Sequence, residues 1–117
     1  MARLSTHVLD TMRGVPAENV TIDLYRVEEN GRRHIKREKT NSDGRTSEPL
    51  LSDENMEAGV YELTFYAGEY FHRCGISLTT PPFLDEIVIR FGLADPKKNY
   101  HVPLLLSPYS YSTYRGS

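Results

Sequence analysis

The sequence predicts an all-β sandwich of seven to eight short strands with one short helix. Segments in which apolar and polar residues alternate are separated by turn signals at regular spacing, which is typical of such a sandwich. Only residues 67–73 have a pattern that favours a helix. The length of 117 residues fits one domain, which we expect to span residues 1–117.

The first forty residues are expected to supply three strands. Residues 3–10 and 20–27 alternate between apolar and polar side chains, so each is interpreted as a strand with one buried face, with a turn over residues 13–17 between them. Asn30-Gly31 is the strongest hairpin signal and leads into residues 34–40. The many charges of that third strand would suit an anionic partner, but they are more typical of a solvated sheet edge.

The middle of the chain is expected to contain a turn, a loop, a strand and the helix. Asp43-Gly44 indicates a tight turn, because glycine adopts positive φ without strain. Residues 46–58 are interpreted as a loop and residues 60–65 as a strand. Gly75 is expected to end the helix.

The last third of the chain is expected to supply three more strands, over residues 86–92, 100–106 and 109–114. Pro103 has no N–H to donate to a neighbouring strand, so it must face outward or lie at an irregularity. Ser107-Pro108 makes the last tight turn.

Composition excludes several classes of protein. The net charge is −2 with both signs interspersed, which predicts neither a nucleic-acid partner nor a membrane partner. The single cysteine, Cys74, excludes an internal disulfide and allows a reducing compartment. No apolar signal segment opens the chain, and its end is not a peroxisomal address, so we expect a cytoplasmic protein.

A few polar residues stand out from their surroundings. His7 and His101 lie in predicted strands, and Arg45 follows the Asp-Gly turn. Tyr114, Arg115 and Ser117 close the chain in place of a loose polar end. Taken singly, each has an ordinary structural interpretation, as a hydrogen-bonded histidine, a solvated turn residue or a packing tyrosine.

The other titratable groups predict no further site. His34 and His72 are interpreted as surface residues, and the four histidines lack the compact spacing of a zinc site, so no metal and no cofactor are expected. The chain has neither a nucleophile elbow nor a glycine-rich phosphate loop. Cys74 is expected to be a small buried apolar residue.

Motifs at both ends resemble the transthyretin family. Residues 106–113 (LSPYSYST) resemble the terminal strand of the transthyretin fold, and residues 114–117 (YRGS) resemble the signature of the hydrolase branch of that family. Residues 4–11 (LSTHVLDT), followed by 13–17 (RGVPA), are similar to the family's opening strand and turn. The resemblance covers nearly the whole chain, from residue 4 to residue 117.

The resemblance implies a reaction and a set of residues that carry it. Members of the hydrolase branch open 5-hydroxyisourate with water, giving 2-oxo-4-hydroxy-4-carboxy-5-ureidoimidazoline in urate breakdown. In them one pocket is lined by the groups that match His7, Arg45, His101 and the terminal tetrapeptide. The expected catalytic residues are therefore His7, Arg45, His101 and Ser117, and the expected substrate-binding residues are His7, Arg45, Tyr114 and Arg115.

The chemistry requires a base, an oxyanion donor and groups that hold a flat polar ring. His7 is assigned as the base that activates water and His101 as its partner, although the reverse assignment is also open. Arg45 would contact the carbonyl oxygens, and Tyr114 would stack or hydrogen-bond at the ring. Arg115 is interpreted as a substrate contact or only an anchor for the tail.

Strand alternation also bears on assembly. If the first strand and the last two strands are neighbours, their outward faces carry His7, Leu9, His101, Pro103, Leu105, Ser112 and Tyr114. Such a face is too apolar for the surface of a monomer. The resemblance implies a homotetramer, a dimer of dimers, with sites at the dimer–dimer interface.

Two other functions compete with the hydrolase. A transthyretin-like carrier of small aromatic hormones would share the fold, but that branch lacks the two histidines, the arginine and the tail as a set. A structural or adhesive sandwich without a ligand is the third possibility.

Overall fold

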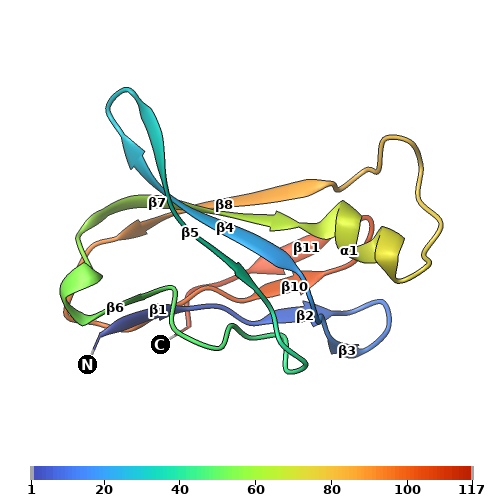
Figure 1. Ribbon diagram of the computed structural model, residues 1–117, viewed down its shortest axis with the longest axis horizontal. Helices are drawn as coiled ribbons and strands as arrows, with labels where there is room; N and C mark the ends of the chain where they lie inside the picture. Colours follow the sequence, from blue (N-terminus) through green and yellow to red (C-terminus); the bar gives the residue numbers. More distant parts are fainter. Residues whose placement is uncertain (1, 117) are drawn as a thin grey trace.

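The computed structural model describes residues 2–116 as a two-layered β-sandwich with one helix at one end (Figure 1). One layer is a four-stranded sheet in the order β5-β4-β7-β8, and the other contains two shorter sheets, β6-β1-β9 and β11-β10-β2-β3. The elements are β1 (Arg3–Ser5), β2 (Val8–Asp10), β3 (Val15–Pro16), β4 (Thr21–Glu28), β5 (Gly31–Lys39), β6 (Leu51–Ser52), the 3₁₀ turn η1 (Asp53–Asn55), β7 (Gly59–Tyr66), α1 (Ala67–Arg73), β8 (Glu86–Leu93), β9 (Tyr100–His101), β10 (Leu104–Leu106) and β11 (Tyr111–Thr113).

The strand predicted over residues 3–10 is broken into β1 and β2, and the strand predicted over 100–106 is broken into β9 and β10. The two breaks lie side by side, because β1 pairs with β9 and β2 pairs with β10 in parallel. Pro103 lies at the second break, where its missing N–H leaves the ladder incomplete, so the expected irregularity is confirmed. Hydrogen bonds from Val102 N to Ser5 O (2.9 Å) and from Leu104 N to His7 O (2.9 Å) hold the broken strands together.

The predicted division of faces in the first strand is confirmed. Leu4, Thr6 and Val8 are buried, whereas Ser5, His7 and Leu9 are only half-buried. Burying apolar side chains of both layers supplies the main favourable term in folding. The core is formed by the inward-facing side chains Leu4, Val8, Val20, Ile22, Leu24, Tyr61, Leu63, Phe65, Tyr70, Phe71, Ile87, Leu93, Val102, Leu104 and Leu106, together with other buried apolar residues.

The expectation that β4 is only half-buried is wrong, because Thr21 and Asp23 on its second face are buried as well. Asp23 accepts two hydrogen bonds from the Arg37 guanidinium, both 2.8 Å, and others from Tyr66 and His34. These bonds, with Arg37 first, hold the pKa of Asp23 well below its usual range despite its burial. A buried, charged carboxylate is stable inside this sheet because both of its oxygens accept hydrogen bonds.

Other details extend or correct the predictions. β5 is an edge strand, as predicted, and α1 spans residues 67–73 and is followed by Gly75 with φ of 79°. The predicted turn over 13–17 contains β3, and the predicted loop over 46–58 contains β6 and η1. The two short strands were missed because two residues are too few to show alternation.

Three further predictions need adjustment. The terminal strand covers only residues 111–113, and Cys74 is half-buried rather than buried. Pro103 is buried, so it does not contribute to the outward face. Among the described residues, no helix is long and apolar enough to cross a membrane.

Candidate active site

The candidate site lies where the β1–β2 break, the 41–48 loop and the end of the chain meet. His7 lies in the break between β1 and β2, and Arg45 lies just after the Asp43-Gly44 turn. His101 ends β9, and its backbone forms a bridge with Gly116. Segments almost a hundred residues apart are therefore joined by backbone hydrogen bonds within one small region.

The turn that carries Arg45 is built by Asn41 and Gly44. The Asn41 side-chain oxygen accepts hydrogen bonds from the backbone N–H groups of Asp43 (2.9 Å) and Arg45 (3.1 Å). Gly44 has φ of 76°, and its carbonyl accepts a 2.8 Å bond from Val8 N. A Cβ atom at Gly44 would overlap the carbonyl oxygen of Val8, so only glycine lets the turn approach β2 so closely.

The same turn orients His7. The His7 Nε2 atom lies 2.8 Å from the carbonyl oxygen of Asp43. A carbonyl oxygen can only accept, so Nε2 carries the proton and donates it. In the neutral ring Nδ1 is then the nitrogen with a free lone pair, and His7 has the tautomer of a base that acts through Nδ1.

His101 is held from two sides. Its Nδ1 lies 2.9 Å from Ser5 Oγ on the neighbouring strand β1. Its backbone exchanges hydrogen bonds with Gly116, at 2.7 and 3.2 Å, and a Cβ atom at Gly116 would lie only 3.0 Å from the His101 ring. The tail thus reaches the histidine at a residue with no side chain.

The electrostatics of the site connect the three predicted residues. Burial is the largest cause that lowers the pKa of His101, followed by Coulombic repulsion from Arg45 and then from His7. His101 is therefore neutral at pH 7. Arg45 and His7 thus both disfavour the imidazolium form of His101.

This arrangement predicts how His101 titrates. In an NMR titration the ring protons of His101 are expected to shift at a pH below the ordinary histidine value. Replacing Arg45 with glutamine removes a positive charge that disfavours the imidazolium, so the midpoint should move to higher pH. An unchanged midpoint in Arg45→Gln would show that Arg45 does not contribute to the lowered pKa.

The terminal residues are distributed differently. The Arg115 guanidinium lies 4.4 Å from the centre of the Tyr100 ring and donates to the Asn99 carbonyl at 3.2 Å, an anchoring position for the tail. Tyr114 is 61% exposed and lines a small cavity between β8 and β11 rather than the histidine cluster. Ser117 lies outside the described residues.

A cavity of about 230 Å³ adjoins the cluster. It is lined by Arg45 and Ser5, together with Arg3, Thr6, Thr46, Ser47, Glu48 and Pro49. Sequence reasoning missed Arg3 and Ser5 as possible site residues. The strand period was the available signal, because Arg3, Ser5 and His7 alternate with the buried residues of the same segment.

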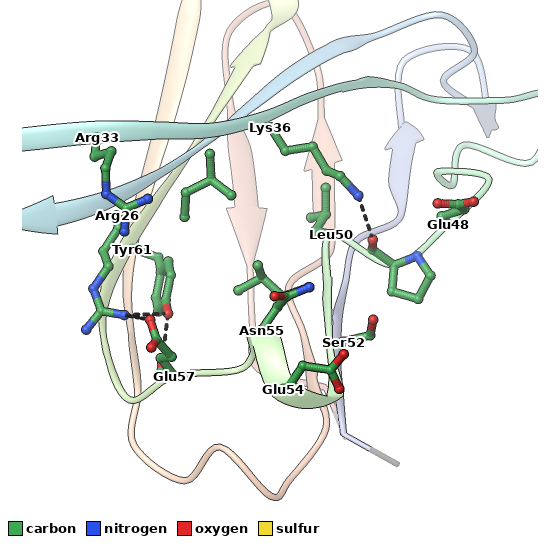
Figure 2. A pocket seen from close by; sticks show the side chains of 13 residues that line it. Arg26, Arg33, Lys36, Glu48, Leu50, Ser52, Glu54, Asn55, Glu57 and Tyr61 are labelled. Atoms are coloured by element: carbon green, nitrogen blue, oxygen red, sulfur yellow. Dashed lines mark hydrogen bonds and ion pairs between the residues drawn. The ribbon is translucent and has the colours of Figure 1, made fainter.

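A larger cavity, about 650 Å³, lies elsewhere, between β5 and the β6–η1 segment (Figure 2). Several of its polar groups are already paired with the protein: Arg26 with Glu57 at 3.0 Å and with Tyr61 at 3.1 Å, and Lys36 with the Pro49 carbonyl at 3.3 Å. The volume of a cavity alone therefore does not identify the candidate active site. Within residues 2–116, no group of three or more histidine, cysteine or acidic side chains could hold a metal ion.

Comparison with known proteins gives the context of this geometry. Residues 4–116 match the HIUase/Transthyretin family. The chain belongs to this family. The 5-hydroxyisourate hydrolase of Ralstonia nicotianae is 53% identical over 117 residues, all of both chains.

Similar solved structures agree with the sandwich. A structure of (S)-allantoin synthase is similar with a TM-score of 0.94 and 45% identity, covering 99% of this chain and 44% of that one. Sea bream transthyretin in complex with thyroxine is similar with a TM-score of 0.86 and 28% identity, covering 98% and 95% of the two chains. The predicted transthyretin-like fold is confirmed.

Proposed function

We propose that this chain is a 5-hydroxyisourate hydrolase, which opens its substrate with water to 2-oxo-4-hydroxy-4-carboxy-5-ureidoimidazoline in urate (purine) degradation. The observation that carries the proposal is the cluster of two oriented histidines and one arginine. The full-length similarity to the Ralstonia hydrolase supports the same reaction.

In the proposed mechanism His7 is the base. Its Nε2–H is held by the Asp43 carbonyl, so Nδ1 takes a proton from water as the water oxygen attacks the ring acyl carbon. The Arg45 guanidinium stabilises the oxyanion that develops on the carbonyl. The C–N bond then breaks, and the leaving nitrogen takes a proton from the site.

His101 is proposed to orient the water or to pass the proton to the leaving nitrogen. Because it is neutral at pH 7, it can accept a hydrogen bond on one ring nitrogen and donate from the other. Ser5 occupies Nδ1, so Nε2 is the nitrogen available to the reactants. The Ser117 carboxylate remains a proposed second orienting group.

The route by direct water attack has a clear test at Ser5. Its hydroxyl is within hydrogen-bonding distance of His101, which is also the arrangement of an activated nucleophile. We expect Ser5→Ala to keep measurable activity with an altered pH profile, because water remains the nucleophile. Complete loss of activity, or a covalent adduct on Ser5 seen by mass spectrometry, would favour a serine intermediate instead.

The alternative function is that of a transthyretin-like carrier of small aromatic hormones. The thyroxine-bound sea bream protein shares the fold at 28% identity, whereas the Ralstonia hydrolase is 53% identical over all residues. A carrier has no use for a His7 tautomer fixed by a carbonyl, beside an Arg45 guanidinium that pairs with no acid within residues 2–116. The hydrolase is therefore favoured.

A homotetramer and a cytoplasmic location are part of the proposal. One row of paired residues crosses the outward face of β3, β2, β10 and β11, in the order Pro16, Leu9, Leu105, Ser112. The two leucines at its centre are half-buried in the single chain. A dimer of dimers would cover this row and enclose the candidate site in a central channel.

Assembly through this row predicts a specific effect of charge. Leu105→Glu places a carboxylate at its centre, and desolvating that charge opposes association. We expect the molar mass measured by light scattering to fall from that of a tetramer to that of a dimer or monomer, with activity reduced. A tetramer that persists in Leu105→Glu would place the interface elsewhere, and Glu69→Gln on α1 is the matched control.

The experiment that tests the function is the ultraviolet decay of 5-hydroxyisourate, generated in place by urate oxidase. We expect the chain to accelerate this decay, and Arg45→Gln to abolish most of the acceleration. No acceleration by the unaltered chain would overturn the hydrolase and leave the carrier to be tested with aromatic ligands.

A further inference from the structure

The arginines of this protein fall into two groups. Eight of the ten have a side-chain hydrogen bond or ion pair with another described residue, namely Arg13, Arg26, Arg32, Arg33, Arg37, Arg73, Arg90 and Arg115. Within residues 2–116, the side chains of Arg3 and Arg45 have neither, and only backbone groups of these two residues are bonded, the N–H groups donating to Asn99 and Asn41. Two guanidinium groups therefore have no acidic partner in the described part of the chain.

These two side chains line the same small cavity. Arg3 comes from β1, and Arg45 comes from the loop after the Asp43-Gly44 turn. The hydroxyl side chains of Ser5 and Ser47 also line the cavity, whereas that of Thr46 already donates to the Glu48 carbonyl. One acid, Glu48, lines it as well, but its carboxylate is not within 4.0 Å of either guanidinium, so the wall has an excess of positive charge.

The position of the cavity relates it to the reaction. Ser5 lies on its wall and also contacts His101, so one residue links the cavity to this histidine. The cavity volume is about 230 Å³, whereas one water molecule takes about 30 Å³ in the liquid. The cavity therefore has room for a group of several non-hydrogen atoms, such as a carboxylate. Arginine pairs with a carboxylate through two parallel hydrogen bonds, so two arginines can hold one carboxylate from both sides.

We infer that Arg3 and Arg45 form a carboxylate subsite, in which Arg3 is a binding residue for the acid that ring opening creates. This inference rests on the proposed hydrolysis. Water adds to the ring acyl carbon, the C–N bond breaks, the nitrogen leaves with a proton, and the new carboxylic acid loses its proton at neutral pH. The substrate carbonyl is neutral, but the product carboxylate carries a negative charge, which appears beside Arg45. Arg3 is the second cation that lines the same cavity.

Binding of orotate tests the subsite without any turnover. Orotate is a flat imide ring with a carboxylate, and uracil is the same ring without it, so their difference in affinity measures the anion. By calorimetry we expect orotate to bind more tightly than uracil. Arg3→Gln should weaken orotate about tenfold or more and leave uracil unchanged, since a hydrogen bond to a charged group is worth that much.

Two variants control the experiment. Arg3→Lys keeps the charge and should retain part of the orotate affinity, whereas Arg90→Gln removes an arginine from β8 and should change nothing. Equal affinity for orotate and uracil, or orotate binding that survives Arg3→Gln, would overturn the subsite. Decay of 5-hydroxyisourate is measured on the same samples. If the unaltered chain accelerates the decay but orotate binding does not depend on Arg3, only the subsite is overturned. If orotate binding depends on Arg3 but the decay is not accelerated, the hydrolase is overturned.

Discussion

Replacing His7 with glutamine is expected to lower the rate of 5-hydroxyisourate opening by about 10²–10⁴-fold, the usual contribution of a positioned general base. The glutamine amide nitrogen can take the place of Nε2 and keep the hydrogen bond to the Asp43 carbonyl. The lone pair at the Nδ1 position is lost. The loss should therefore appear in kcat, measured from initial rates of ultraviolet decay, while the fold stays intact.

His101→Asn is the matched comparison for His7. The asparagine amide can occupy the position of Nδ1 and keep the contact with Ser5, while the group at Nε2 is removed. We expect a smaller loss than in His7→Gln if His7 is the base. A larger loss in His101→Asn would reverse the two roles, and nearly unchanged rates in both variants would remove the histidines from the mechanism.

The largest effect on stability is expected at Asp10, at the end of β2. Its buried carboxylate accepts hydrogen bonds from the backbone of Met12 and Arg13, both 3.0 Å, from Arg13 Nε at 2.9 Å and from the Tyr70 hydroxyl at 2.7 Å. Burial by itself raises the pKa of Asp10, but the bonds from Arg13 and Tyr70 outweigh it, so the pKa is lowered overall. The carboxylate therefore ties the turn after β2 to α1.

Asp10→Ala is expected to lower the free energy of unfolding by about 3 kcal/mol, because bonds to a charged group contribute about 1.5–3 kcal/mol and the Arg13 side chain can return to water. Chemical denaturation with an unchanged slope would measure it. Asp10→Asn keeps an oxygen for the two backbone N–H groups and should lose roughly half as much. A loss below about 0.5 kcal/mol in Asp10→Ala, the level of an ordinary surface substitution, would contradict this role.

Sequence reasoning was most accurate where local chemistry decides the structure. Alternation assigned the buried and outward faces of the first strand, and Gly75 marks the end of α1. Both features depend on residues within a few positions of each other. Sequence reasoning failed to predict the burial of Asp23 on β4. This polar residue is buried because Arg37, Tyr66 and His34 donate hydrogen bonds to it from neighbouring strands.

Some residues of the candidate site were predicted from the sequence, and others were missed. The motifs at the two ends of the chain pointed to His7, Arg45 and His101, because those residue types in that order accompany one reaction. They did not point to Ser5 or Arg3, whose importance depends on what faces them. Tyr114 and Arg115 are grouped with the histidines by the motif, yet in the single chain they line another cavity, and Arg115 contacts Tyr100.

The sequence by itself determined an all-β sandwich of the transthyretin type, with polar residues that match those of the hydrolase branch. Apolar–polar alternation, turn residues and short motifs are local features that can be recognised in the sequence. Only the tertiary structure decided which groups meet. Ser5 reaches His101 across 96 residues through the register of β1 on β9, and the Asp43 carbonyl selects the proton position on His7 from 36 residues away. Such contacts depend on strand pairing and loop closure, which place distant atoms within 3 Å, and no local pattern encodes them.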